Sequence, residues 1–400
     1  MRVAVLNQFY APQRFGGAEL SVQMLCEALV ARGNEVTVIT GSVADTRDRE
    51  TINGVNVLRI KGGNLYNWNG QKHPVAVRAV WHSIDAWNPM AFRHVRRALC
   101  GVRPDLLHTN NLAGFSASAW GAAKSLGVPV AHTLRDYYLL CPSSGMFRGL
   151  SNCIRQCAAC NLMSIPKRLA ARAVRGVIGI SEYILRRHQQ AGLFAKEQVS
   201  GVIPNPVSLP VRPEKQPFNG RGLALGFLGR LEPAKGIEVL LKTLTDHDFC
   251  GWSEVIVGGR GSDEYERALR HKYNDSRVKF LGLIDPTAFF NRVDLLVVPS
   301  LWNEPFGRVV IEAYAHGVPV VASNRGGLNE LVKNGEDGFL FNPDSSDSLR
   351  NLLIHLASQV GLMEKLQRGT FSNVSCHSPE AIASAYEGFF ARVINKRSFC

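Results

Sequence analysis

The stretch VVPSLWNEPFGRVVIEAYAHGVPVVAS, residues 297–323, indicates the fold class and contains the first candidate site. It continues an apolar run, Asp294 to Pro299, which predicts a buried parallel strand that ends in a turn. The turn Glu304-Pro305-Phe306-Gly307 then leads into a helix, because Pro is tolerated at a helix start. Glu312 follows about two helical turns later. Open α/β sheets bind ligands beyond the carboxyl ends of their strands, where two carboxylates suit the hydroxyls of a sugar.

Positive charge follows another predicted strand, Leu223 to Leu228, further upstream. Gly229-Arg230 and Lys235-Gly236 come directly after that strand. Carboxylates alone would repel a phosphate, so a nucleotide sugar needs cations close to them. The sequence therefore predicts a site that holds both the sugar and the phosphates of a nucleotide sugar.

Three motifs in register resemble the donor site of retaining glycosyltransferases of family 4. They are Phe227-Leu228-Gly229-Arg230, Lys235-Gly236 and the run from Glu304-Pro305-Phe306-Gly307 to Glu312. The resemblance covers nearly the whole chain. It implies an α/β architecture of the GT-B type, in which two doubly wound parallel-sheet, Rossmann-like domains face each other across a cleft.

The resemblance also implies a role for each of these residues. Arg230 and Lys235 would stabilise the leaving diphosphate, since preorganised charge is usually the largest catalytic term. Glu304 would contact the transferred sugar and Glu312 the ribose hydroxyls. Phe306 and Gly307 would contact the sugar through their backbone.

The amino-terminal segment predicts a βαβ unit: a strand from Arg2 to Tyr10, a helix to about Arg32 and a strand from Glu35 to Thr40. Gly16 and Gly17 open the helix, where free amide groups can receive an anion. A tight turn is the alternative interpretation. The same GGAE step occurs in family 4, where it faces the diphosphate of the donor.

A further strand, Val128 to Leu134, continues into Arg135-Asp136. Family 4 members often have His-Asp there, with the His close to the transferred sugar. Arg cannot act as a base at neutral pH, so a role for Arg135 must be electrostatic or hydrogen-bonding. His132 lies at an odd offset along the strand and is expected to be a packed histidine. His108 is expected to be structural as well.

The densest group of thiols predicts either a structural zinc site or a loop with isolated reduced cysteines. Four thiolates within about twenty residues suit tetrahedral zinc, but all four positions would be filled, which excludes a catalytic metal. No set of residues for a catalytic metal is evident, so no cofactor is expected for the chemistry. The four residues are Cys141, Cys153, Cys157 and Cys160.

The chain of 400 residues is too long for one core and predicts two domains. Residues 1–205 would form the acceptor-side domain and 208–378 the nucleotide-sugar domain, separated by the extended step Pro204-Asn205-Pro206. A last helix, about 379–400, would return to the first domain. No apolar span for a membrane is expected, so the chain is interpreted as cytoplasmic, with peripheral contact to the inner face of the membrane at most.

Charge and aromatic side chains concentrate in the first half. Residues 1–205 hold 24 Lys and Arg against 11 Asp and Glu, while the second half is balanced. A generic basic surface is one interpretation, and an anionic membrane carrying a lipid-linked saccharide is the other. No nucleic-acid motif is present. An aromatic and polar segment could recognise the acceptor or pack beneath loops; it contains Tyr66, Trp68, Trp81, His82, Asp85 and Trp87.

With the resemblance to family 4, these patterns imply a metal-independent, retaining hexosyltransferase that moves a sugar from a nucleotide diphosphate sugar to a hydroxyl acceptor. The favoured acceptor is a lipid-linked or cell-surface saccharide precursor, as in polysaccharide biosynthesis. Two alternatives remain: a sugar-nucleotide epimerase of the same fold, and a non-catalytic nucleotide-sugar-binding protein. The sequence leaves the base, the sugar, the acceptor, the linkage and the oligomeric state open.

Overall fold

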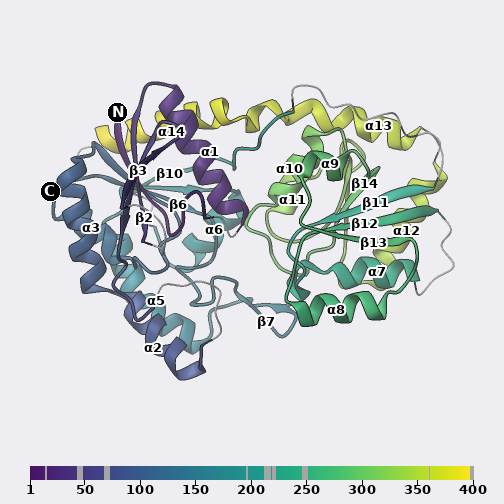
Figure 1. Cartoon of the computed structure of the whole chain (residues 1–400), viewed down its shortest axis with the longest axis horizontal. Coiled ribbons are helices and arrows are strands. Elements are labelled where there is room, and N and C mark those ends of the chain that lie inside the picture. The colour runs from purple at the N-terminus through teal and green to yellow at the C-terminus, as the bar shows by residue number, and fades with distance from the viewer. Residues whose placement is uncertain are drawn as a thin grey trace. The chain divides into compact units, whose positions relative to one another are not determined.

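A computed structural model describes most of the chain, namely residues 1–13, 16–42, 48–66, 73–194, 197–210, 218, 222–245, 251–359 and 361–396. The chain divides into two compact units (Figure 1). Unit 1 comprises Met1–Met146, Cys153–Pro206 and Pro379–Cys400, and unit 2 comprises Phe147–Asn152 and Val207–Ser378. None of the helices in these described ranges is both long and apolar enough to cross a bilayer.

Unit 1 is built on an eight-stranded sheet, counted over its described residues. The strand order is β10-β9-β6-β5-β1-β2-β4-β3, and every pair is parallel except β3 with β4. The strands are β1 (Arg2–Leu6), β2 (Glu35–Gly41), β3 (Arg49–Ile52), β4 (Val55–Ile60), β5 (Leu106–Thr109), β6 (Val130–Leu134), β9 (Gly176–Gly179) and β10 (Val199–Val202). The helices are α1 (Gly17–Ala31), α2 (Val75–Ala86), α3 (Pro89–Val102), α4 (Ser118–Lys124), α5 (Ala158–Ala171), α6 (Glu182–Gln190) and α14 (Pro379–Asn395).

The core of unit 1 joins the two ends of the chain. β5, β6 and β9 are buried along their whole length, as expected for parallel strands covered on both faces. Helix α14 packs against α1, and Phe389 and Val393 lie so close to β9 that a Cβ at Gly176 would collide with them. An ion pair of 2.8 Å between Arg32 and Glu387 fastens the same helix at the surface.

Unit 2 contains a six-stranded parallel sheet and a separate hairpin, β7 (Phe147–Arg148) with β8 (Ser151–Asn152), within its described residues. The sheet order is β13-β12-β11-β14-β15-β16. Its strands are β11 (Leu223–Leu228), β12 (Trp252–Gly258), β13 (Val278–Gly282), β14 (Leu295–Val298), β15 (Val320–Ser323) and β16 (Gly338–Phe341). Its helices are η1 (Pro233–Lys235), α7 (Ile237–Thr245), α8 (Asp263–Lys272), α9 (Pro286–Phe290), α10 (Arg308–Ala315), α11 (Leu328–Leu331), α12 (Ser346–Ser358), α13 (Leu362–Gly369), η2 (Thr370–Asn373) and η3 (Ser375–His377).

The strand order of unit 2 determines where its ligand site is expected. Chain order runs outward from β11 in one direction through β12 and β13, and from β14 in the other through β15 and β16. The direction of winding therefore changes between β11 and β14. In doubly wound sheets this switch point, at the carboxyl ends of the strands, is where ligands bind.

The two doubly wound parallel sheets confirm the predicted architecture of the single domains. Both strands predicted in the second half, Leu223 to Leu228 and Asp294 to Pro299, are present as β11 and β14. One helix is shorter than predicted: the pattern from Gly114 to Leu126 gave a longer helix, whereas α4 starts at Ser118. Gly114 and Ser116 have positive φ values of 86° and 58°, a left-handed conformation that a helix cannot contain.

Candidate functional site

Two loops meet at the switch point of unit 2. The loop after β11 turns through η1 and reaches Gly236, whose φ of 70° is left-handed. A Cβ at Gly236 would overlap the carbonyl oxygen of Pro299 in the loop after β14. Glycine is therefore required for the two loops to lie against each other, and this contact brings Lys235 to Glu304.

Lys235 and Glu304 form the central ion pair of the site. Lys235 Nζ lies 2.6 Å from Glu304 Oε1, which also accepts a hydrogen bond of 2.9 Å from Ser300 Oγ. The Glu304 side chain is 8% exposed and that of Lys235 is 22% exposed. The structure thus brings together two of the predicted residues, in a setting where little water screens their charges.

The loop after β15 fixes the backbone of Glu304 from another side. The Gly327 amide donates to the Glu304 carbonyl oxygen at 2.7 Å. A Cβ at Gly326, whose φ is 56°, would overlap that same oxygen. Gly326 is needed for this close approach, so Glu304 is held by backbone as well as by its side chain.

Arg230 lies in the loop after β11 but is far more exposed. Its side chain is 65% exposed, and Nη2 lies 3.1 Å from Glu232 Oε1. A pair this exposed contributes little to stability. The guanidinium can therefore leave Glu232 for an anionic ligand at small cost.

Phe306, Gly307 and Glu312 follow β14 in the predicted order. Phe306 is buried, and Gly307, with a φ of 114°, precedes α10. The helix starts directly after the predicted turn, with the left-handed Gly307 at its N-cap, so Pro305 lies in the turn and not at the first helical position. Glu312 Oε1 lies 3.0 Å from Arg308 Nε. Burial raises the pKa of the Glu312 carboxyl, and Arg308 opposes this shift.

Arg135 lies in unit 1, directly after β6, and is 6% exposed. Its Nε donates to Asn110 Oδ1 at 2.8 Å, and Nη1 donates to Asn205 Oδ1. Burial lowers the pKa of the guanidinium, which Tyr386 and Cys26 oppose. The two asparagine oxygens thus fix the orientation of Arg135 without neutralising its charge.

Gly16 and Gly17 also lie in unit 1, where α1 begins at Gly17 as predicted. Gly16 is extended, with φ of −172°, and makes no side-chain cap. The Glu19 carboxylate lies in the first turn, 3.6 Å from where a Cβ of Gly16 would be. An acidic group already faces the positive end of the helix there.

The predicted cysteine cluster comes together only in part. The sulfur atoms of Cys141 and Cys160 are 3.7 Å apart, and Cys157 forms a hydrogen bond with Cys160. Cys153 is half-buried. Across the described parts of the chain, no group of three or more His, Cys, Asp or Glu residues is arranged to hold a metal ion. The structural zinc stays a prediction.

Two residues of the aromatic and polar segment have structural partners, which agrees with the interpretation that this segment packs beneath loops. Trp81 is buried and donates from Nε1 to the Tyr66 carbonyl oxygen at 2.9 Å. Asp85 is buried and accepts a hydrogen bond of 2.7 Å from the Tyr138 hydroxyl. Trp87 is 45% exposed and remains available, whereas Trp68 lies outside the described residues.

The two strand histidines are structural, as predicted. His132 is buried, and its Nδ1 lies 2.9 Å from Thr109 Oγ1. His108 Nε2 lies 2.8 Å from Thr133 Oγ1. Burial lowers the pKa of His132 to about 3 and that of His108 well below its usual value. Both rings are therefore neutral and unsuited to acid–base chemistry near pH 7.

Lys167 is one of the basic residues of the first half, but its charge does not lie at the surface. It is 4% exposed, and Nζ donates to the Tyr138 carbonyl oxygen at 2.7 Å and lies over the Tyr138 ring. Burial lowers the pKa of Lys167 to about 8, against the effect of Asp85 and Asp136. This lysine cannot meet a membrane, because its charge is used inside unit 1.

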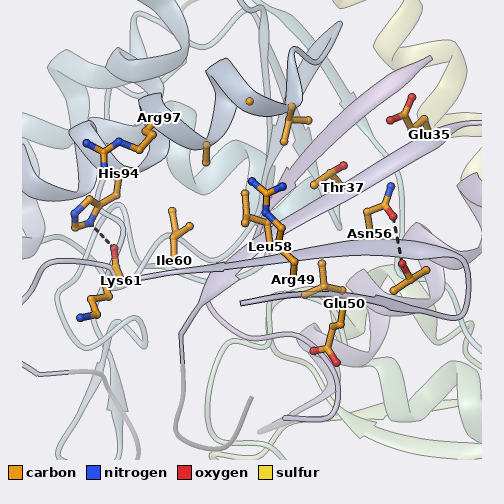
Figure 2. Close-up of a pocket in the computed structure, with 15 residues that line it drawn as sticks. Glu35, Thr37, Arg49, Glu50, Asn56, Leu58, Ile60, Lys61, His94 and Arg97 are labelled. Atoms are coloured by element: carbon orange, nitrogen blue, oxygen red, sulfur yellow. Dashed lines mark hydrogen bonds between the residues drawn. The ribbon is translucent and has the colours of Figure 1, made fainter. Parts of the chain in front are cut away.

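A cavity of about 710 Å³ lies elsewhere on unit 1, between the outer strands of the sheet and α3 (Figure 2). Arg49, Lys61, His94 and Arg97 line it, and His94 Nδ1 lies 2.7 Å from the Lys61 carbonyl oxygen. None of the predicted site residues lines this cavity. It is not the donor site that the sequence indicates.

Four polar residues of these sites were not predicted: Asn110, Asn152, Asn205 and Ser300. Asn110 and Asn205 bind Arg135, Ser300 binds Glu304, and Asn152 binds the loop just before Glu304. Ser300 and Asn205 had a signal, since both stand next to prolines in the stretches that mark the loop and the linker. Asn110 follows β5 at the same sheet edge as Arg135. Asn152 had no signal in its neighbourhood.

Comparison with known proteins covers almost all of the chain. Residues 15–210 match the model of Glycosyltransferase Family 4, and residues 211–370 match that of Glycosyl transferases group 1. A Klebsiella pneumoniae protein described as an uncharacterized 42.6 kDa protein in cps region is 33% identical over 336 residues, which are 83% of this chain and 88% of that protein.

More distant relatives have names that describe an activity or a ligand. The phosphatidyl-myo-inositol mannosyltransferase of Mycobacterium leprae is 26% identical over 88% of this chain and 86% of its own length. Anabaena HepE, solved in complex with UDP, has a TM-score of 0.70 at 21% identity, over 98% of this chain and 100% of that one. The chain therefore belongs to the glycosyltransferases of the family 4 and group 1 type, which have the GT-B fold and use nucleotide sugar donors.

Proposed function

We propose that this protein is a retaining, metal-independent hexosyltransferase that moves a sugar from a nucleotide diphosphate sugar to a hydroxyl acceptor. The observation that carries the proposal is the 2.6 Å pair of Lys235 and Glu304 at the switch point of unit 2. It offers a cation for a diphosphate and a carboxylate for sugar hydroxyls within one hydrogen bond of each other. Unit 2 would bind the donor, and unit 1 would bind the acceptor.

In this mechanism the protein mainly stabilises charge. The bond between the sugar's anomeric carbon and the diphosphate breaks while the acceptor oxygen attacks the same face, so the configuration is retained without a covalent intermediate. Lys235 and the exposed Arg230 would neutralise the leaving diphosphate, the term that usually dominates such catalysis. Arg135 would add positive charge from unit 1.

The remaining predicted residues would position the donor. Glu304 would contact the transferred sugar, and Phe306 and Gly307 would contact it through backbone groups. Glu312 would accept hydrogen bonds from the ribose hydroxyls, after Arg308 releases it. The amides of Gly16 and Gly17 would face the diphosphate.

The proposed donor is a sugar linked to a nucleoside diphosphate, which can be UDP, GDP or ADP. UDP and UDP-glucose are bound in structures of HepE, which supports this class of donor. A thermal-shift screen against nucleotide sugars tests it, because a ligand that binds the folded state raises its stability by RT ln(1 + [L]/Kd). We expect one family of nucleotide sugars to raise the melting temperature of the wild type. No shift with any of them would contradict the proposal.

Two alternatives would share the donor site. A sugar-nucleotide epimerase would convert the donor without releasing nucleoside diphosphate, and a non-catalytic binder would leave it intact. Release of nucleoside diphosphate in the presence of acceptor supports the transferase over both. No observation on the site favours either alternative.

We further propose that the acceptor is lipid-linked and that unit 1 meets an anionic membrane at the inner face. One side of α5 carries exposed Leu162, Ile165 and Leu169, spaced as one helix face. Ile154, just before α5, is 84% exposed, and α2 beside α5 exposes Val75 and Val80. Arg155 and Arg172 are exposed at the two ends of α5. Apolar and basic side chains together suit the surface of an anionic bilayer.

The names of two relatives support this acceptor class. One is named a phosphatidyl-myo-inositol mannosyltransferase, and the other is described as a protein in a cps region. A lipid-linked saccharide for cell-surface polysaccharide biosynthesis is therefore the proposed acceptor. We propose no role in binding nucleic acid.

Co-sedimentation with liposomes tests the membrane proposal. The wild type should pellet with anionic liposomes and less with neutral ones, and less again at high salt. Arg155→Glu and Arg172→Glu should each reduce pelleting, whereas Lys279→Glu, on β13 of unit 2, makes the same charge change at an exposed position and serves as the control. Equal pelleting with neutral and anionic liposomes would contradict the proposal.

A further inference from the structure

The hairpin of β7 and β8 is a short element with an unusual turn. Phe147 pairs with Asn152 and Arg148 with Ser151, so Gly149 and Leu150 form a two-residue turn. Their φ values are 56° and 64°, the signs of a type I′ turn. Leucine rarely adopts this conformation, and Leu150 is 61% exposed. The strain is local, and the turn places Asn152 at the end of the hairpin.

Asn152 uses both ends of its carboxamide on the donor loop after β14. Its Nδ2 donates to the Leu301 carbonyl oxygen at 2.7 Å, and its Oδ1 accepts from the Asn303 amide at 2.8 Å. One side chain therefore satisfies two backbone groups, much as a neighbouring strand would. The hairpin and the loop both belong to unit 2, although the chain on either side of the hairpin belongs to unit 1.

The same loop is held from its other side by the loop that carries Lys235. The amides of Leu301 and Trp302 donate to the Ala234 carbonyl oxygen at 3.0 and 3.1 Å. Irregular backbone needs such outside partners for its polar groups. Asn152 and Ala234 thus fix the segment immediately before Glu304, whose carboxylate pairs with Lys235.

We propose that Asn152 is a positioning residue for the donor site: it holds the segment Leu301–Asn303 so that Glu304 meets both Lys235 and the transferred sugar. The inference rests on the proposed function, because it takes Glu304 as the residue that contacts the sugar. A small displacement of a reacting group lowers turnover strongly, so the clamp acts on chemistry more than on nucleotide binding.

Two variants of Asn152 separate the clamp from simple packing. Asn152→Ala removes both hydrogen bonds. Asn152→Asp keeps the shape but places an oxygen against the Leu301 carbonyl oxygen, so it should be as harmful as Ala. Ser151→Ala and Ser151→Asp make the matching changes one residue earlier on the hairpin, where the side chain is exposed.

Hydrogen exchange without any ligand gives the first readout. Amide exchange in a peptide that spans residues 299–306 should be faster by about tenfold or more in both Asn152 variants and unchanged in both Ser151 variants. Exchange at the wild-type rate in Asn152→Asp would overturn the clamp. Because this variant keeps the shape of Asn, it decides the question even if truncation disturbs the hairpin.

Kinetics give the second readout. In both Asn152 variants kcat for the nucleotide sugar should fall about 10- to 100-fold, while the Kd for UDP alone stays within about threefold. An unchanged kcat, or an equal loss of UDP affinity, would overturn the positioning role. Failure of the proposed function would appear differently, as no turnover by the wild type of any nucleotide sugar.

Discussion

Replacing Lys235 with Met removes the cation of the central ion pair and keeps most of the side-chain volume. Glu304, 8% exposed, then retains Ser300 as its hydrogen-bond donor but loses the charge 2.6 Å away. Breaking a buried pair in this way costs about 3–5 kcal/mol. Lys235 is 22% exposed and Ser300 remains, so we expect a loss of about 2 kcal/mol in the free energy of unfolding.

The loss of activity should be larger than the loss of stability explains. Removing one preorganised charge at the leaving group should lower kcat by about two orders of magnitude, or about 2.7 kcal/mol in the activation free energy. Lys279→Met, on the edge strand β13, removes the same charge from an exposed position and should change neither quantity.

A double variant distinguishes pairing from independent effects. Combining Lys235→Met with Glu304→Gln leaves no buried unpaired charge, so its stability loss should be smaller than the sum of the single losses by about 1–3 kcal/mol. Its activity should stay low. Urea unfolding and steady-state release of nucleoside diphosphate measure the two quantities. Additive stability losses, or near wild-type turnover in Lys235→Met, would refute the reasoning.

Four further predictions follow from single features. Arg230→Ala should lower turnover by about two orders of magnitude without loss of stability, because its side chain is 65% exposed; unchanged turnover would remove its role. Arg135→His should keep measurable activity and Arg135→Glu should abolish it, so an active Glu variant would show that Arg135 does not serve the diphosphate. Elemental analysis of untagged protein should find about one zinc per chain, and a chelator should lower the melting temperature without blocking turnover; absence of zinc would contradict this. Burial lowers the pKa of His188 from 6.5 to about 4, so the buried neutral ring contributes its full stability above pH 6.5 and loses it as the pH falls through 4. At pH 5 the unfolded chain is already protonated at His188 and the folded chain is not, which lowers the free energy of unfolding by about 2 kcal/mol. His188→Gln should therefore flatten the pH dependence of stability in urea titrations.

Much of the fold could be predicted because parallel strands buried on both faces leave continuous apolar runs. β11 has the bounds that its sequence indicated, Leu223–Leu228. The edge strand of the first sheet was harder to predict. This strand, β3 (Arg49–Ile52), is short and half exposed, so its sequence pattern does not differ from that of a loop. The predicted helix was longer than α4 because Ser116 has a left-handed conformation, which serine rarely adopts and which the sequence does not indicate.

The candidate site was predictable where residues follow strands and not where contacts come from distant segments. Lys235 and Glu304 each stand after an apolar run, but only the strand order places β11 beside β14. Asn152 lies about 150 residues from its partners, in a turn formed by Leu150, so no local pattern marks it. The burial of Lys167 has no local signal either, because the carbonyl oxygen that accepts its hydrogen bond belongs to Tyr138 on another segment.

We propose that the donor loops of unit 2 transfer a sugar from a nucleotide with retained configuration. Transfer to water in the absence of acceptor tests it most directly, with free nucleoside diphosphate measured by chromatography and the anomer of the released sugar followed by NMR. We expect the wild type to hydrolyse one class of nucleotide diphosphate sugar slowly, and the first sugar released to have the anomeric configuration of the donor. Lys235→Met should lower the rate of release about 100-fold, while Lys279→Met should leave it unchanged. Release of the inverted anomer, conversion of the donor into its epimer without release, or equal rates in the two lysine variants would contradict the proposal.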